Sequence, residues 1–255
     1  MIITDTHTHL YSEAFEKDQD EMMSRALQAG VSRFFVPAID STYTESMYDL
    51  ERKYPNYVFL MMGLHPTHVK EDYKQELTHV KTALEQRKFV AVGEIGIDLY
   101  WDQSTLKQQQ DAFRMQIQWA KEYKLPIVIH CRDAFDEIFD ILEEEQSDDL
   151  FGIFHCFTGT LVQARRAIDL NMLLGIGGVV TFRNSGLAET VAQISLDNLV
   201  LETDAPYLAP MPHRGKRNES SYLPLIATKL AETHNVSVSE IVKITTENAK
   251  RLFEI

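Results

Sequence analysis

A repeated unit constrains this chain more than any other feature: a short apolar run followed by a segment with helical patterning. The apolar runs begin near residues 2, 33, 58, 89, 126, 151, 172 and 199. They are almost continuously apolar, which is typical of parallel strands covered on both faces of their sheet. The pattern predicts helices over residues 14–29, 44–54, 72–87, 106–123, 134–145, 161–170, 186–194, 223–234 and 239–253.

Eight such units predict an α/β fold of the (β/α)8 TIM-barrel type. An open, doubly wound sheet is the alternative, but eight evenly spaced units disfavour it. The length of 255 residues fits one barrel, since these domains commonly have about 250 residues. No linker or low-complexity segment interrupts the chain, so we expect a single domain over residues 1–255.

The bulk composition narrows the class of partner. A formal net charge of −13 disfavours non-specific binding to nucleic acid or to anionic lipid. A nucleic-acid substrate remains compatible, because metal ions and local cationic groups can reverse the field inside a cleft. Two cysteines imply no disulfide framework, and no signal peptide or membrane span is visible. We expect a cytoplasmic protein with no membrane attachment and no evident obligate protein partner.

Histidines and carboxylates fall at the ends of the predicted strands. In a TIM barrel the active site lies at the carboxyl ends of the strands, and five of the nine histidines are found there. The strand-end residues are His7 and His9 on the first strand, His65 on the third, Glu94 on the fourth, His130 on the fifth, His155 on the sixth and Asp204 on the eighth.

These donors predict a metal centre. They are too many for one catalytic zinc ion and suit two divalent ions about 3.5–4 Å apart, bridged by a carboxylate. Alternation along a strand would place the first two histidines on one face. Zinc and manganese fit the donors, and magnesium fits less readily. The expected metal ligands are His7, His9, Glu94, His130, His155 and Asp204, with Glu94 as the bridge.

The remaining histidines, and Asp5, receive other roles. His65 is a candidate for a substrate phosphate contact, whereas His68, His79 and His234 are expected at the surface. We expect Asp5, one step deeper in the first strand, to support a histidine ligand without touching metal.

Each cysteine directly follows one of the candidate histidines. Alternation along the strand turns Cys131 and Cys156 to the opposite face. We therefore expect both to be small buried residues packed against helices, and not thiolate ligands.

Cationic and aromatic side chains also follow the strands. Because the chain as a whole is acidic, three cationic clusters at one end of a barrel indicate an anionic substrate, and arginine matches phosphate oxygens. Arg132 and Arg214 are the candidate phosphate contacts. Tyr100, Trp101 and Phe182 are candidates for stacking on terminal bases. The clusters are Arg132-Asp133, Phe182-Arg183-Asn184 and the segment 213–218.

The strand-end motifs resemble those of the TatD family of metal-dependent hydrolases, within the amidohydrolase-like TIM barrels. The resemblance covers almost the whole chain and implies a deoxyribonuclease, often a 3′–5′ exonuclease acting on single-stranded ends. Glu94 stands where other amidohydrolase-like enzymes offer a carbamylated lysine. The matching motifs are residues 5–9, 63–66, 93–98, 126–133, 155–159, 202–207, 212–218 and 248–253.

The expected reaction is hydrolysis of a phosphodiester by two metal ions, with Glu94 as the bridge and Asp204 as general base. Hydrolysis of a smaller ester or amide, including an aminoacyl ester on RNA, is an alternative that would use the same donors. A metal-bearing binding protein without catalysis is an alternative of another class. The residues leave the metal, the cellular substrate, the exo or endo preference and the oligomeric state open.

Overall fold

The eight predicted strands are present and neighbouring strands pair in parallel, which confirms the TIM-barrel prediction. In the computed structural model, which describes residues 2–254, each strand pairs with the next along the chain in the orders β1-β2-β3 and β4-β5-β6-β7-β8. The strands are β1 (Ile3–Asp5), β2 (Val31–Val36), β3 (Val58–Leu60), β4 (Val92–Asp98), β5 (Ile127–Arg132), β6 (Gly152–Phe154), β7 (Met172–Ile176) and β8 (Leu199–Leu201).

Two seams join the three-stranded and five-stranded parts into a ring. At the first, Met62 bridges Val92, and the Gly93 N–H donates to the Met62 carbonyl at 3.0 Å. At the second, Thr8 bridges Ala205, and the His9 N–H donates to the Ala205 carbonyl at 2.7 Å. The second seam lies beyond the ends of β1 and β8, so the barrel closes through the same backbone that carries His9.

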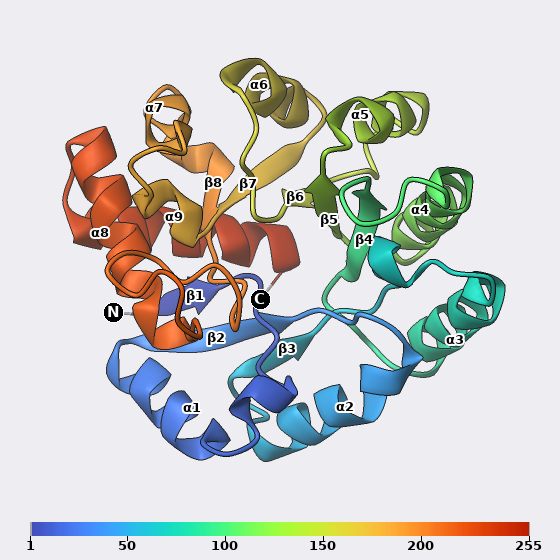
Figure 1. The fold of residues 1–255 in the computed structure, drawn as a ribbon, viewed down its shortest axis with the longest axis horizontal. Helices are drawn as coiled ribbons and strands as arrows, with labels where there is room; N and C mark the ends of the chain where they lie inside the picture. Colours follow the sequence, from blue (N-terminus) through green and yellow to red (C-terminus); the bar gives the residue numbers. More distant parts are fainter. Residues whose placement is uncertain (1, 255) are drawn as a thin grey trace.

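Helices surround this ring (Figure 1). Their buried residues are mostly apolar, so each helix contributes one face to the core, as an amphipathic surface helix does. The α-helices are α1 (Gln19–Gln28), α2 (Thr44–Lys53), α3 (Tyr73–Gln86), α4 (Leu106–Tyr123), α5 (Phe135–Glu144), α6 (Leu161–Asp169), α7 (Leu187–Val191), α8 (Leu223–His234) and α9 (Val238–Phe253).

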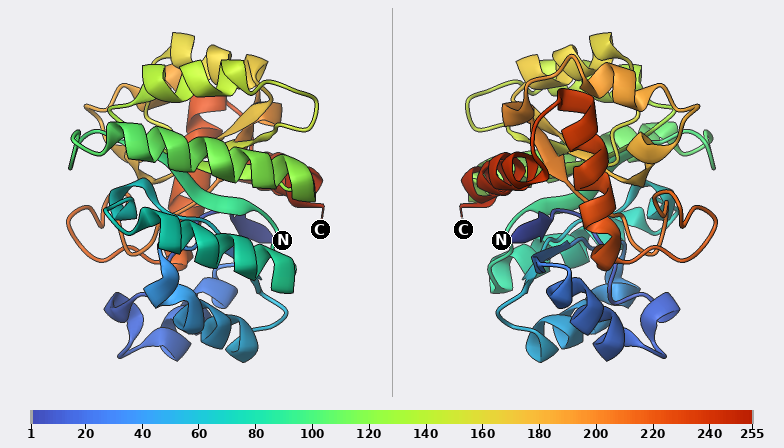
Figure 2. Two further views of the ribbon diagram at one scale, coloured as in Figure 1. Left: turned by 90° about the vertical axis from the view of Figure 1, so that its right-hand side faces the viewer. Right: turned by 90° about the vertical axis from the view of Figure 1, so that its left-hand side faces the viewer.

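Helix α9 covers one end of the barrel. Figure 2 shows it beside both chain termini, with the loop after β8 projecting from the opposite side. The Phe253 ring stacks on that of Phe35 with ring centroids 4.0 Å apart, within a buried apolar cluster that includes Met61 and Val200. The amino-terminal end of the barrel is therefore closed, and the end where the strand-end polar residues gather is the open one.

The first predicted helix, residues 14–29, is divided in the structure. Residues Glu13–Phe15 form a 3-10 turn, and α1 begins only at Gln19. Asp18 between them has a non-helical φ of −145°, and its carboxylate accepts hydrogen bonds from Arg25 and Arg217. An ion pair with a residue far away in sequence thus interrupts a pattern that was locally helical.

Among residues 2–254, no helix is both long and apolar enough to cross a bilayer.

Candidate metal centre

Glu94 of β4 lies at the centre of the strand-end residues, with only 2% of its surface exposed. One carboxylate oxygen, Oε2, faces the residues that follow β1: it lies 3.1 Å from Nε2 of His7 and 3.6 Å from Nε2 of His9. Oδ1 of Asp204 completes this side, at 3.8 Å from His7 Nε2 and 3.5 Å from His9 Nε2. These four side chains form the first half of the cluster.

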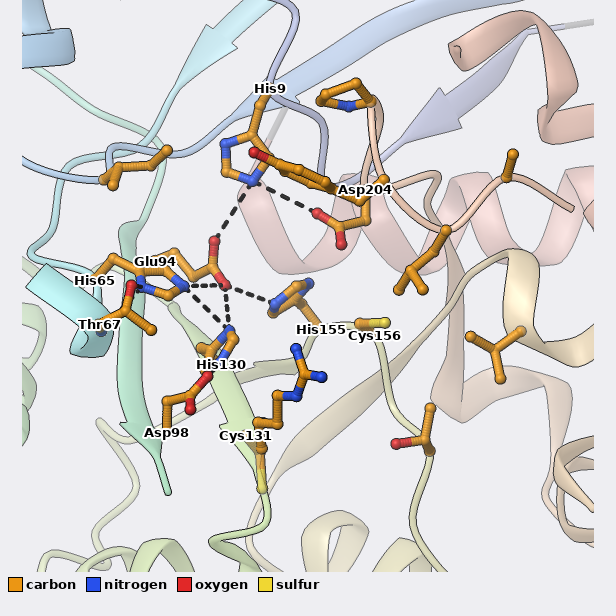
Figure 3. Close-up of a pocket in the computed structure, with 18 of the residues that line it drawn as sticks. His9, His65, Thr67, Glu94, Asp98, His130, Cys131, His155, Cys156 and Asp204 are labelled. Atoms are coloured by element: carbon orange, nitrogen blue, oxygen red, sulfur yellow. Dashed lines mark hydrogen bonds and ion pairs between the residues drawn. The ribbon is translucent and has the colours of Figure 1, made fainter. Parts of the chain in front are cut away.

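The other oxygen of Glu94, Oε1, faces the histidines of the third, fifth and sixth units (Figure 3). It lies 2.7 Å from Nε2 of His155, 2.8 Å from Nδ1 of His130 and 3.2 Å from Nε2 of His65. The structure thus brings His65, expected to touch substrate, to the same carboxylate as the predicted ligands. The two oxygens of one side chain thus face different donors, and His155 lies between the two sides, because its ring also stacks on that of His7 with centroids 3.8 Å apart.

The local backbone explains how β4 reaches this position. Gly96 pairs with His130 in the register of β4 and β5. Its φ of +141° is a conformation that side chains rarely permit, and a Cβ there would lie 2.1 Å from the His130 carbonyl oxygen. Only glycine lets the two strands approach so closely beside Glu94 and His130.

The prediction that His7 and His9 lie on a strand is wrong, but both side chains still converge on Glu94. Strand β1 ends at Asp5, so both histidines lie beyond it and simple alternation does not orient them. Their rings are 5.1 Å apart at an angle of 72°. The second barrel seam, through Thr8, orients them toward Glu94 instead.

Three polar groups lie behind the candidate ligands, two of them within hydrogen-bond distance, and the sequence alone assigned a role to none of them. Oδ2 of Asp98 lies 2.9 Å from Nε2 of His130, and the Tyr11 hydroxyl lies 2.9 Å from Nδ1 of His9. Oε1 of Glu202 lies 3.5 Å from Nδ1 of His155. Such partners fix the ring orientation and tautomer of a ligand histidine.

A positional signal for these partners exists in the sequence. Glu94, Gly96 and Asp98 alternate along one strand and so share a face of β4. Tyr11 and Glu202 each lie two residues from a candidate ligand, His9 and Asp204 respectively. Spacing alone does not show that their side chains turn toward a ring, because both lie outside the strands.

Burial and charge give these groups unusual proton affinities. Burial alone would raise the pKa of Glu94, but the surrounding histidines hold that pKa well below its ordinary value. Burial lowers the pKa of His65 to about 4, and it lowers the pKa of His7 as well. For His155, burial is outweighed by Glu94 and Glu202, which raise its pKa well above normal. Two neutral imidazoles thus adjoin an ionised carboxylate.

The donor set fits metal ions. Three groups of candidate ligands have ligand atoms within 4.8 Å of one another, and all three include a histidine of the cluster. His7 Nε2 faces Glu94, while its buried Nδ1 has no hydrogen-bond partner among the described residues. Imidazole with carboxylate is the donor chemistry of zinc and manganese. The groups are His7-His155-Asp204, His7-His9-Glu94 and His65-Glu94-His130.

Asp5 lies behind the cluster but bonds to a different element than expected. Its carboxylate accepts hydrogen bonds from the Thr203 N–H and hydroxyl, at 2.9 and 2.6 Å, and from the Ser220 hydroxyl at 2.7 Å. The His7 N–H lies at the longer distance of 3.5 Å. Burial raises the pKa of Asp5 to about 7. Asp5 therefore braces the backbone next to Asp204, and its link to a histidine runs through the main chain.

Both cysteines line the pocket, although they were expected to pack against helices. Cys131 packs partly against the core, yet both Cys131 and Cys156 are half-buried and line the pocket. Strand β6 ends at Phe154, and Cys156 has a φ of +45°, so alternation does not govern its direction. Burial raises the pKa of both thiols, that of Cys131 to about 12, so both are protonated at neutral pH.

A pocket of about 920 Å³ opens above the cluster. Arg132 and Arg214, the candidate phosphate contacts, both line it, and each guanidinium lies over an aromatic ring. The Arg132 guanidinium carbon is 3.9 Å from the Tyr100 ring centre, and that of Arg214 is 4.5 Å from the Phe182 ring centre. Cationic groups therefore stand at the pocket of an otherwise acidic protein.

The three histidines expected at the surface are only partly exposed. His68 lines the pocket, with Nε2 3.5 Å from Oδ2 of Asp40. His79 Nε2 lies 2.8 Å from the Thr44 hydroxyl, and neither residue lines the pocket. His234 is the last residue of α8 and does not line the pocket.

The barrel and its buried histidine–carboxylate cluster define a metal-dependent hydrolase. The family model described as TatD related DNase matches residues 4–254, and the chain belongs to this family. It is 41% identical to the uncharacterized metal-dependent hydrolase YabD of Bacillus subtilis, over the full length of both chains. It is 32% identical to the 3′-5′ ssDNA/RNA exonuclease TatD of Erwinia tasmaniensis, covering 98% of this chain and 99% of that protein.

The architecture agrees with a solved relative. The crystal structure of YJJV, a TatD homolog from Escherichia coli K12, superposes with a TM-score of 0.93 at 32% identity, covering 99% of this chain and 98% of the other. The chain is thus a hydrolase of the TatD family that acts on ester bonds.

Proposed function

We propose that this enzyme is a 3′–5′ exonuclease that hydrolyses phosphodiester bonds at single-stranded nucleic-acid ends with two divalent metal ions. The observation that carries the proposal is the division of donors by Glu94, beneath a pocket lined by cationic side chains. A relative of the same length is named as an exonuclease of this kind. Zinc, manganese or magnesium are the candidate ions.

The residues have distinct roles in this proposal. His7, His9 and Asp204 would hold one ion, His130 and His155, with His65 beside them, would hold the other, and Glu94 would serve both. Bound divalent ions supply Lewis-acid stabilisation of phosphate charge and lower the pKa of water.

Asp204 is the proposed general base. It is the most exposed of the candidate ligands on its side, with 13% of its side chain accessible, and it lines the pocket. Burial alone would raise the pKa of Asp204, but a hydrogen bond with His9 and the charges of the neighbouring histidines lower it overall, so the carboxylate is ionised. It can therefore accept the proton of a water molecule that attacks from the pocket. Arg132 and Arg214 bind phosphate oxygens and stabilise the charge that develops there.

The test is product analysis on end-labelled strands with one defined metal at a time. A 5′-labelled single strand should shorten stepwise from its 3′ end, and a blunt duplex should be degraded more slowly. An aminoacyl ester on RNA serves as the rival substrate. Faster cleavage of that ester than of any phosphodiester would replace the proposal with the carbonyl-ester alternative.

Asp204→Asn removes a candidate metal ligand and the proposed base together. The variant removes the base, so it should lose cleavage while the cation-lined pocket still binds the strand. Unchanged cleavage in both Asp204→Asn and Glu94→Gln would favour a metal-bearing protein that is not catalytic through this centre. Thr228→Ala, an exposed substitution on α8, is the matched control.

A further inference from the structure

We propose that the turn after β4, Tyr100-Trp101, forms with Arg132 a stacking subsite for one nucleobase beside the scissile phosphodiester. The inference rests on the proposed nuclease function and adds a recognition element to it. Trp101 and Arg132 line the same pocket as the candidate metal ligands. An aromatic platform at this position is therefore within the space that a bound strand must enter.

The two aromatic side chains are exposed to an unusual degree. Trp101 has 70% and Tyr100 has 55% of its surface accessible. Their rings meet edge to face at 90°, with centroids 5.0 Å apart. A large apolar surface left in water at the rim of a pocket indicates a binding role, because solvation of such a surface is unfavourable.

Arg132 completes the platform. Its guanidinium carbon lies 3.9 Å from the Tyr100 ring centre and 5.8 Å from that of Trp101. A planar cation beside an aromatic face offers stacking to a base and charge to the adjoining phosphate. One group of side chains can thus hold both parts of a nucleotide.

Asp98 ties this platform to the metal centre. Its Oδ1 accepts the backbone N–H groups of Tyr100 and Trp101 at 3.0 and 3.1 Å, while its Oδ2 lies 2.9 Å from Nε2 of His130. Gln109 holds the Asp98 backbone on both sides, at 2.8 and 3.1 Å. A single buried carboxylate therefore fixes the turn relative to a candidate ligand.

Such a subsite favours single strands. Stacking has no sequence preference, because every base presents a π face, but it needs a face that no neighbouring base covers. Terminal bases of a duplex stay stacked on their neighbours and pay an unstacking cost before they can enter. The platform thus accounts for a single-strand preference without any base-reading contact.

Fluorescence of the metal-loaded enzyme tests the subsite directly. The chain has two tryptophans, and the second, Trp119, lies on α4 and packs against the core. A single strand with phosphorothioate linkages at its 3′ end, which resist hydrolysis, should quench Trp101. Trp101→Phe should lose the quenching yet bind within about twofold of wild type, because phenylalanine keeps a stacking face.

Trp101→Ala, combined with abasic strands, identifies the bound group. Loss of one stack should weaken binding about tenfold, measured by fluorescence anisotropy of a dye at the 5′ end. An abasic nucleotide near the 3′ end should weaken wild-type binding to a similar degree and cause no further loss in Trp101→Ala. Equal abasic penalties in both proteins at every terminal position, or wild-type affinity in Trp101→Ala, would overturn the inference.

Cleavage measured on the same strands without phosphorothioate separates the two proposals. Normal cleavage, with the same abasic penalty in wild type and Trp101→Ala, would support the nuclease function and contradict the subsite. An abasic penalty that is present in wild type and absent in Trp101→Ala, without any cleavage, would support base stacking on Trp101 and contradict the nuclease function. If the wild-type enzyme neither binds nor cleaves these strands, both proposals are contradicted.

Discussion

The hydroxyl of Tyr11 lies 2.9 Å from Nδ1 of His9 and donates its own hydrogen to the Pro37 carbonyl, also at 2.9 Å. Because the phenol has one hydrogen, it must accept from the Nδ1–H group of His9. Nε2 of His9 then keeps its lone pair toward Glu94 and Asp204. A buried tyrosine thus selects the tautomer in which this histidine can bind metal.

Removal of that hydroxyl should weaken metal binding. Tyr11→Phe leaves the ring in place but frees Nδ1, so the His9 ring loses its preferred orientation. Loss of such a partner lowers metal affinity by about 10- to 100-fold, measurable by calorimetric titration of the metal-free enzyme. Tyr43→Phe is the matched control, since its ring packs 5.6 Å from that of Tyr11. Equal affinities in Tyr11→Phe and the control would exclude the tautomer role.

Glu94→Gln should disable both halves of the cluster together. The substitution keeps the shape of the side chain but removes the charge that faces His7 on one side and His155 on the other. We expect a loss of several kcal/mol in transition-state stabilisation, about 10³-fold in rate. Metal content by mass spectrometry should fall in parallel. Full metal occupancy with undiminished cleavage would contradict a bridging role.

Chelation should abolish hydrolysis and also reduce stability. The cluster gathers ionised and partly protonated groups in a buried site, which metal ions would satisfy. A ligand at 100 times its dissociation constant stabilises the native state by about 2.7 kcal/mol, or roughly 5–10 °C in Tm for a chain of this size. Thermal unfolding with and without EDTA, and with added Zn²⁺ or Mn²⁺, measures the shift. Activity that survives thorough metal removal would contradict the mechanism.

A network of ion pairs predicts how the free energy of unfolding changes at acid pH. Arg25 contacts Glu219 at 2.6 Å and Asp18 at 3.0 Å, and Arg217 contacts Asp18 at 2.6 Å. Hydrogen bonds from Arg217 and Arg25 hold the pKa of Asp18 well below normal. Burial alone would raise the pKa of Glu219, but the two arginines and Ser221 lower it overall.

The sign of the pH effect follows from these depressed pKa values. Both carboxylates stabilise the fold above their unfolded pKa of about 4, and this contribution is lost as pH falls through the lower folded values. The free energy of unfolding of Glu219→Gln, from urea titrations, should lie below wild type at pH 7, and the difference should close toward pH 3. Glu232→Gln, in an exposed pair with Lys229 at 3.9 Å, should show no such convergence. A constant difference for Glu219→Gln across this range would refute the network's role.

Much of this architecture is predictable because it depends on periodicity. Apolar runs at regular intervals define the eight strands, and the rule that barrel strands present their carboxyl ends to the active site brings His130 and Asp204 together. The prediction that the fourth strand ends at Glu94 is wrong, because Glu94 is the third residue of β4, which continues to Asp98. The candidate metal donors could be chosen for the same reason, because each lies on a strand or in the few residues that follow one.

The supporting contacts depend instead on how non-repetitive backbone turns. Asp5 and Thr203 are 198 residues apart, and nothing in the spacing of either indicates a hydrogen bond between them. Cys156 turns toward the pocket because the chain leaves β6 before it, and His65 joins Glu94 because the segment after β3 carries it inward. Arg132 stacks on Tyr100 through a turn that Asp98 shapes. Pairings of this kind arise from loop conformation, which periodicity does not encode.

The floor made by α9 has a consequence for biosynthesis. The Thr246 hydroxyl donates to the Ile2 carbonyl at 3.1 Å, and Phe253 stacks on Phe35. The first strand, which leads into His7 and His9, is thus anchored by a helix that is synthesised after every candidate ligand. A nascent chain stalled before residue 238 would hold all the candidate metal ligands without the helix that helps to align them. Metal capture should therefore begin only once α9 has been made.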